Sequence, residues 1–260
     1  MKRVIIIICT LMSCISVQAQ NFYNKPLNTT YNDFWSQIKL GLHAGVDLGA
    51  AAPWPLSSAI GGGDRLTAVP KVTPSLGIVT GYIFNEKWSI NTEVTYRTVG
   101  VNATIVTLEK GQNFTIDGEK VLFRGQATMS MSFSQMEVPL YARWDINQTN
   151  AVTLGLFYSY IAHGEFIASP IEGNIVSAST PDATPEPLTA NSVPEQNFSS
   201  SLSNWDIGYQ IGYERRIAEH LAIGGRFTMG VKDIFKPKEK YLDYSMLQMR
   251  GTLQLVYRFR

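Results

Sequence analysis

The closing stretch of the chain sorts into an apolar and a polar face. The apolar parity holds Leu247, Met249, Gly251, Leu253, Leu255, Tyr257 and Phe259. The opposite parity holds Gln248, Arg250, Thr252, Gln254 and Arg258. A period of two with one apolar face and one charged face predicts a β-strand that ends almost at the carboxyl terminus.

The same alternation recurs in seven earlier segments. They cover residues 38–48, 76–84, 88–97, 136–144, 152–160, 206–214 and 221–232. Each is about ten residues long, which is the length that a tilted strand needs to cross a bilayer. With the closing strand, the sequence predicts eight antiparallel strands. Pro139 lies inside one of them, and a closed barrel has no edge strand, so we expect a bulge or a lost ladder bond there.

Connection lengths between these segments alternate between short and long. Short turns fall at 85–87, 145–150 and 218–220, whereas long connections fall at 50–73, 99–130 and 163–203, with a medium one at 233–243. Short periplasmic turns and long extracellular loops are typical of outer-membrane barrels. We therefore predict an all-β fold, an eight-stranded antiparallel up-and-down transmembrane β-barrel.

Which face points inward separates a soluble barrel from a membrane barrel. Aromatic residues of the apolar parity gather at both strand ends, as interfacial girdles do. They are Phe84, Trp88, Trp144, Tyr213, Tyr257 and Phe259 at the short-turn ends and Tyr96, Tyr158, Tyr160 and Trp205 at the long-loop ends. A basic residue facing lipid near the midplane costs about 2–4 kcal/mol, so the charged parity is expected inside.

The inward parity supplies charges of both signs that can pair inside the barrel. The structural ion-pair candidates are Glu93, Arg97, Glu137, Arg143, Asp206, Glu214, Arg226 and Arg250. His43, Asp47, Lys39, Lys232 and Arg258 share this parity. Eight strands leave an interior just wide enough for side chains, so we expect a plugged lumen. A narrow, porin-like channel remains the alternative.

The amino terminus has the pattern of an export signal. Met1-Lys2-Arg3 precedes the apolar run Val4 to Met12, and Val17-Gln18-Ala19 fits a cleavage site. We expect a signal peptide at 1–19, a short periplasmic segment at 20–36 and the barrel at 37–260. Leu11-Met12-Ser13-Cys14 is a loose lipobox, which leaves a lipoprotein as the alternative. Both cysteines fall within the expected signal peptide.

Candidate chemistry is sparse. The three histidines, His43, His163 and His220, fall at three different places of the predicted barrel, so no metal site is expected. Ser159 and His163 share a strand face but lie about 13 Å apart, too far for a catalytic pair. We expect no cofactor, no catalytic residue and no enzyme activity, with a lipid-modifying enzyme as the least favoured alternative. Loss of Lys2 and Arg3 with the signal leaves a charge balance that argues against nucleic acid.

Two of the long connections carry further patterns. The stretch from Gly164 to Asn204 has no Lys or Arg and is a candidate contact loop, although it can equally be a solvated loop. Its acidic residues are Glu165, Glu172, Asp182, Glu186 and Glu195. Asp117-Gly118 stands between two alternating runs and predicts a hairpin that extends two strands above the membrane.

Four stretches resemble the PorT-like outer-membrane β-barrels of Gram-negative bacteria, which are similar to small OmpA- and OmpX-type barrels. They are the hairpin 81–90, the strand 136–144, the run 207–213 and the closing Leu255-Val256-Tyr257-Arg258-Phe259. The resemblance implies location in the cell outer membrane and insertion by the barrel-assembly machinery, for which a terminal aromatic strand is the signal. Here Arg260 follows Phe259, so the aromatic residue is penultimate.

The resemblance supplies no functional residues, and some relatives serve gliding or protein secretion. We expect an interaction, envelope-structural or secretion-associated component that acts through its extracellular loops. The expected partners are outer-membrane lipid and lipopolysaccharide, the barrel-assembly machinery during biogenesis, and an envelope or secretion protein.

Overall fold

The computed structural model describes residues 37–55, 65–116, 119–177, 186–189, 196–237 and 245–259. The chain divides into two units, Met1–Gln37 and Ile38–Arg260, and the second holds the sheet. The expected signal peptide at 1–19 and the expected segment at 20–36 lie outside the described residues. No helix of the described part is long and apolar enough to cross a membrane.

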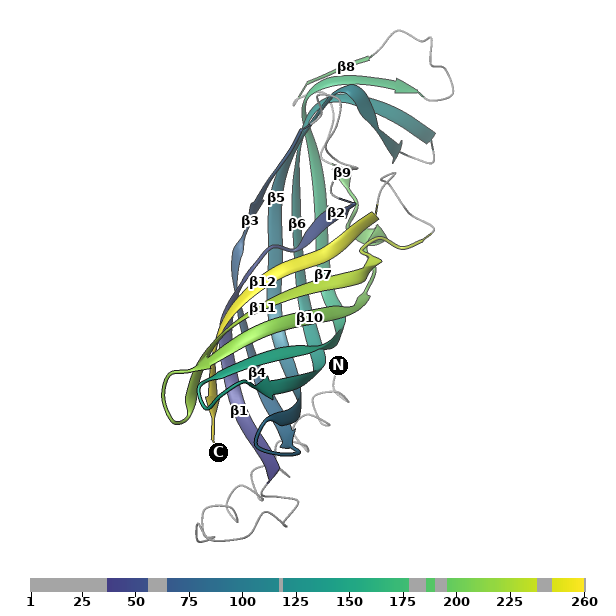
Figure 1. Ribbon diagram of the computed structural model, residues 1–260. Coiled ribbons are helices and arrows are strands. Elements are labelled where there is room, and N and C mark those ends of the chain that lie inside the picture. Colours follow the sequence, from purple (N-terminus) through teal and green to yellow (C-terminus); the bar gives the residue numbers. More distant parts are fainter. Residues whose placement is uncertain are drawn as a thin grey trace, which may run out of the picture. The chain divides into compact units, whose positions relative to one another are not determined.

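Eight antiparallel strands close into a ring (Figure 1). In ring order they are β1 (Ile38–Leu48), β4 (Val72–Ile83), β5 (Trp88–Ile116), β6 (Glu119–Asp145), β7 (Asn150–Ser177), β10 (Trp205–Arg216), β11 (Leu221–Asp233) and β12 (Ser245–Arg258). The ring closes where β12 pairs with β1, from Gly41↔Arg258 to Leu48↔Gly251. Each of the eight strands predicted from the alternation is present, and the eight-stranded barrel is confirmed.

Four short strands bring the whole sheet to twelve strands. β2 (Ala51–Trp54) pairs with β12, and β3 (Arg65–Pro70) pairs with β5. β8 (Glu186–Thr189) and β9 (Gln196–Asn197) both pair with β7, and the 3-10 helix η3 (Ser199–Ser201) follows β9. All four lie outside the ring of paired barrel strands and belong to connections that the sequence predicts as loops.

Short turns join the strands at the periplasmic end. The Asn85 side-chain oxygen accepts the backbone N–H groups of Lys87 (2.9 Å) and Trp88 (3.0 Å). Asn147 caps the next turn in the same way, with the N–H of Asn150 at 2.8 Å. The side-chain oxygen of asparagine can accept the backbone N–H groups of the residues two and three positions later. For this reason asparagine favours tight turns.

The two faces of the barrel wall differ as the alternation predicts. Lipid-facing positions remain exposed, such as Leu140 at 56% and Leu154 at 62%, whereas Arg97 and Glu137 on the inner face are fully buried at 0%. The predicted girdle aromatics are exposed on the outer face at both ends, and Trp88 stacks on Trp144 with ring centroids 6.1 Å apart. The polar-inside arrangement of a membrane barrel is therefore confirmed.

Three strands are far longer than a membrane crossing requires. β5, β6 and β7 have 29, 27 and 28 residues, whereas about 9–11 residues cross the bilayer. In Figure 1 these strands run on past the other barrel strands toward β8. The connection at 99–130 is the predicted extension of two strands, now seen as the ends of β5 and β6. The prediction of a loop for the first part of 163–203 is wrong, because β7 continues to Ser177. The hairpin predicted at Asp117-Gly118 is confirmed, since Ile116 pairs with Glu119.

The pattern of the inner and outer faces reverses along these long strands. On β5 the inner face changes from Arg97 to Val99, and on β6 it changes from Gln135 to Phe133, which are register partners. The outer face of β5 changes from apolar to polar, from Tyr96 to residues such as Asn102. This reversal defines an outer boundary, where lipid ends and an aqueous surrounding begins.

The ladder between β5 and β6 is interrupted at Pro139. Thr92 pairs with Leu140 and Thr95 with Glu137, with no pair between them and no change of register. Proline has no backbone N–H to donate, and its carbonyl instead accepts the Thr92 hydroxyl at 2.8 Å. The expected local loss of ladder bonding is confirmed.

Candidate functional site

The barrel interior contains two layers, a charged layer within the membrane part and an apolar layer above it. We call the charged layer the lumen network. It consists of Asp47, Glu93, Arg97, Glu137, Arg143, Glu214, Arg226, Arg250 and Arg258. All of these side chains lie on the inner parity of their strands, so their positions follow directly from the alternation.

Glu93 is the centre of one cluster in the lumen network. Both of its carboxylate oxygens accept hydrogen bonds from Arg226, at 3.0 and 2.7 Å. The Tyr141 hydroxyl donates to the same carboxylate at 2.5 Å, and the Arg226 guanidinium lies over the Tyr141 ring. The His43 Nε2 is 3.5 Å from Glu93 and 2.9 Å from the Thr95 hydroxyl. Bidentate pairing offsets much of the cost of burying both charges.

A second cluster joins four strands nearer the outer boundary. Arg97 donates to Asp47 at 2.9 Å and lies 3.3 Å from Glu137. Glu137 also accepts from Arg250, whose guanidinium lies over the Phe157 ring. Because Asp47, Arg97, Glu137 and Arg250 come from β1, β5, β6 and β12, this cluster connects strands that are not all neighbours in the sheet.

A third cluster lies near the short turns. Arg258 binds both oxygens of Glu214 at 2.7 Å each, and Arg143 donates to the same carboxylate. Arg143 also donates to Asp145 at 2.8 Å. Every arginine of the lumen network therefore contacts a carboxylate, and positive and negative charges occupy the cross-section at three levels.

Asp206 is the one sequence-predicted lumen candidate for which the described residues show no ion pair. It lies on β10 and is 3% exposed, and one of its carboxylate oxygens accepts the N–H of Ile207 at 2.8 Å. The other seven candidates, Glu93, Arg97, Glu137, Arg143, Glu214, Arg226 and Arg250, are brought together in the three clusters.

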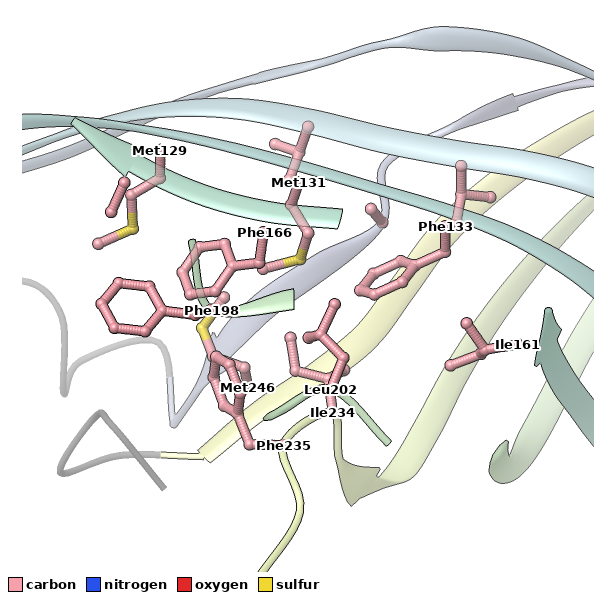
Figure 2. Packing of buried hydrophobic residues seen from close by; sticks show 14 of the residues in the cluster. Met129, Met131, Phe133, Ile161, Phe166, Phe198, Leu202, Ile234, Phe235 and Met246 are labelled. Carbon is pink, nitrogen blue, oxygen red and sulfur yellow. The ribbon is translucent and has the colours of Figure 1, made fainter. Parts of the chain in front are cut away.

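An apolar core closes the interior above the outer boundary, and we call it the apolar cap. It consists of Ala50, Val99, Val101, Ile105, Met129, Met131, Phe133, Ile161, Phe166, Ala168, Phe198, Leu202, Ile234, Phe235 and Met246. Figure 2 shows these side chains converging from β6, β7, β12 and the segments around η3. The Phe166 ring packs against Phe198 (centroids 5.7 Å apart) and Phe235 (5.5 Å).

The segment around η3 is tied across the mouth of the barrel by backbone bonds. Phe198 donates to the carbonyl of Phe166 at 2.9 Å, and Ser203 donates to that of Ile234 at 2.7 Å. The Ser199 hydroxyl accepts the N–H of Phe166 at 3.0 Å. These bonds hold the segment between β7 and the end of β11, so Phe198 and Leu202 cover the lumen network from above.

The acidic candidate contact residues do not share one loop. Glu165 and Glu172 lie in β7, and Glu186 lies in β8, which pairs with β7. Asp182 and Glu195 lie outside the described residues. The loop part of the interpretation does not hold for Glu165, Glu172 and Glu186, because paired backbone groups order their segments into a sheet. Their role as contact residues stays a prediction.

The serine and histidine considered as a catalytic pair lie on opposite faces. The register between β6 and β7 shifts between Ser134↔His163 and Gln135↔Ile161, so Ala162 is an extra residue. Ser159 is therefore buried inside and His163 is exposed outside, and the prediction that they share a face is wrong. Among the described side chains, no group of three His, Cys, Asp or Glu could hold a metal ion.

The apolar cap escaped prediction from the sequence, although a signal for it exists. Met129, Met131 and Phe133 alternate with small polar residues, as do Val99 and Val101 with theirs. These apolar residues occupy the inward positions of their strands, and in the membrane part of the barrel the inward positions are polar. Reading the parity across residues 99–133, beyond the membrane segments, could have found the reversal.

A closed antiparallel barrel with an apolar outer face, two aromatic girdles and a charged interior is an integral outer-membrane barrel. The profile of the family described as outer membrane protein beta-barrel domain matches residues 18–236. The chain belongs to this family, and its location is the cell outer membrane.

Several solved structures are similar to this chain. Ail, the attachment invasion locus protein of Yersinia pestis, is 12% identical with a TM-score of 0.40, over 85% of this chain and 98% of that chain. Neisserial surface protein A is 10% identical with a TM-score of 0.38, over 85% and 97%. OprG from Pseudomonas aeruginosa is 13% identical with a TM-score of 0.29, over 86% and 94%. A comparison with curated proteins gives no match.

Proposed function

We propose that this outer-membrane barrel is a sealed, non-enzymatic interaction component of the envelope. Its working surface is the projecting sheet, by which we mean β5 beyond Arg97, β6 before Gln135 and β7 beyond Tyr160, together with β3, β8 and β9. An envelope or secretion protein is the proposed partner. The resemblance to PorT-like barrels, some of which serve protein secretion, supports this role.

The observation that carries the proposal is the apolar cap. A narrow channel needs a continuous polar path, and the cap places Phe133, Phe166 and Phe235, each at most 2% exposed, above the ion-paired lumen. An apolar plug above a charged layer opposes the passage of ions at both levels. The cap therefore supports a binding role over the channel alternative.

The cap also explains how the projecting sheet is held in one conformation. Residues 98–116 of β5 extend about 60 Å along the strand, and a long hairpin alone is marginally stable in water. Here the three strands share one apolar face in the part nearest the membrane, on β5 as far as Ile105, where Phe198, Leu202 and Phe235 pack against it. A sheet ordered in this way can bind a partner with a smaller loss of conformational entropy than a mobile loop.

Site-specific photo-crosslinking in cells tests the proposal. A photoreactive amino acid is placed in the full chain at Ile171 or Pro187, both exposed on the β7 and β8 side of the projecting sheet. A matched probe is placed at Glu86 in a periplasmic turn. We expect a discrete protein adduct of one mass from the first two positions and none from Glu86. Absence of adducts from both projecting positions, or an adduct from Glu86 alone, would contradict the proposal.

A further inference from the structure

The outer face of the projecting sheet changes character directly above the lipid-facing surface. Below the boundary, β5 and β6 present Tyr96, Met136 and Val138 outward. Above it, the same strands present only glycine and small polar residues for several rows. This polar outer face consists of Thr98, Asn102 and Thr104 on β5 and Thr128, Ser130, Ser132 and Ser134 on β6.

Cross-strand register makes this face a ladder of short polar side chains. Thr98 pairs with Ser134, Asn102 with Ser130, and Thr104 with Thr128. Side chains of directly paired residues lie about 5 Å apart, and successive rows on one face are about 7 Å apart. The result is an array of hydrogen-bonding groups with no large side chain on β5 or β6 to interrupt it between Thr98 and Thr104.

Lys71 lies on this array in a defined position. Its backbone N–H donates to the carbonyl of Gly100 at 2.9 Å, and its ammonium donates to the Ser130 hydroxyl at 3.3 Å. A Cβ placed on Gly100 would lie 2.9 Å from the Lys71 Cδ. The absence of a side chain at Gly100 thus leaves room for the Lys71 stem to cross β5 and bring its charge over β6.

The charge on this face is asymmetric. Lys71 forms no ion pair with any described residue, and its ammonium retains donors beyond the bond to Ser130. Glu165 lies on the β7 side of the face, opposite Ser132. An anionic group can therefore bind at the β5 side, where the Lys71 backbone meets Gly100 two rows above the girdle residue Tyr96.

We propose that the polar outer face binds the phosphorylated sugar headgroup of lipopolysaccharide in the outer leaflet. Lys71 contacts a phosphate, and the hydroxyl and amide groups of Thr98, Asn102 and the neighbouring serines contact sugar hydroxyls. Two arguments commit the face to this occupant: it continues the lipid-facing surface without a gap, and its cation complements a phosphate. The proposal rests on the outer-membrane location and is independent of the proposed protein partner.

Binding of rough-type lipopolysaccharide to the full chain folded in detergent tests the proposal. The variants are Lys71→Gln, Lys71→Arg and, as the matched control, Lys87→Gln, which removes the same charge in an exposed periplasmic turn. A partly exposed charge pair contributes about 1 kcal/mol to binding, so its loss corresponds to about fivefold weaker binding. We expect about that loss for Lys71→Gln, recovery with Lys71→Arg and no change for Lys87→Gln.

Two further measurements complete the test. Heat-modifiable migration on a detergent gel verifies that each variant is folded, so a loss of binding cannot come from misfolding. Dephosphorylated lipopolysaccharide should bind the wild-type chain as weakly as intact lipopolysaccharide binds Lys71→Gln. Unchanged affinity of folded Lys71→Gln, or equal affinity of the wild type for phosphatidylglycerol, would overturn the proposal. The crosslinking positions Ile171 and Pro187 lie outside this face, so the two proposals fail separately.

Discussion

Arg226 of β11 and Glu93 of β5 bind each other through two hydrogen bonds, 3.0 and 2.7 Å long, across the interior of the barrel. The two strands are not neighbours in the sheet. The pair therefore joins opposite parts of the wall through the lumen, which backbone ladders cannot do. In a barrel of this size such pairs fill the interior that a wider barrel would leave to water.

Removing one partner of this pair should destabilise the barrel. Glu93→Leu leaves the Arg226 guanidinium buried without its carboxylate, and we expect a loss of about 3–5 kcal/mol in the free energy of unfolding. Urea titration of the refolded protein in micelles, followed by tryptophan fluorescence, measures this loss. Glu86→Leu in an exposed turn is the control and should change the free energy by less than about 0.5 kcal/mol.

The double variant Glu93→Leu/Arg226→Leu separates ion pairing from packing. Replacing both charges with apolar side chains removes the unpaired charge, so most of the lost stability should return. If the double variant is as unstable as the sum of its single variants, the two residues are not coupled in the folded barrel.

Glu137 contacts two arginines, Arg97 and Arg250, and its loss should be at least as costly. We expect Glu137→Ala to lower the free energy of unfolding by about 3–5 kcal/mol, because two guanidinium groups lose a buried partner. The same urea titration applies. A change below about 0.5 kcal/mol would show that Glu137 holds no buried ion pair.

The apolar cap should contribute to stability like the core of a soluble domain. Phe235 is 1% exposed and packs on Phe166, so Phe235→Ala should cost about 3–5 kcal/mol if cap and barrel unfold together. Hydrogen exchange gives the alternative readout, since a cap that opens separately would lose protection in 161–168 while β10 to β12 stay protected. Full retention of both stability and protection would contradict the packing described for the cap.

The outer boundary can be located with arginine substitutions along one strand. Leu140 and Ser132 lie on the same outer parity of β6, below and above the boundary. In phosphatidylcholine bilayers, Leu140→Arg should cost about 2–4 kcal/mol because it faces lipid. Ser132→Arg should change the free energy of unfolding by less than about 0.5 kcal/mol. Similar costs at both positions would place the boundary elsewhere.

The barrel itself was predictable because the orientation of each side chain on a strand follows from its position in the sequence. A strand has a period of two, so alternation alone assigns residues such as Arg97 to the inside and Tyr96 to the outside. Turn residues such as Asn85 mark where the strands end. The pairing partners inside the lumen were not predictable to the same degree, since they depend on how the strands are staggered around the ring. Asp206 illustrates this, because it has the parity of the lumen network but no ion pair with a described residue.

The apolar inner face of the projecting sheet and the extension of β7 were missed because the meaning of each parity depends on the surrounding solvent. Within lipid the apolar face points outward, and above the boundary it points inward, as Val99 shows next to Arg97 on the same strand. A pattern that reverses in this way looks like a weak or broken strand when only membrane crossings are sought. On β7 the extra residue Ala162 also exchanges the positions that point inward and outward. A bulge of this kind leaves no clear signal in one sequence.

Single-channel recording in a planar bilayer tests whether the lumen is sealed by ion pairs below and by the apolar cap above. The refolded full chain, shown by heat-modifiable migration to be a closed barrel, is inserted and held under an applied voltage. A sealed lumen predicts a flat baseline after insertion, with no sustained openings. Sustained, stepwise openings of reproducible size would contradict it.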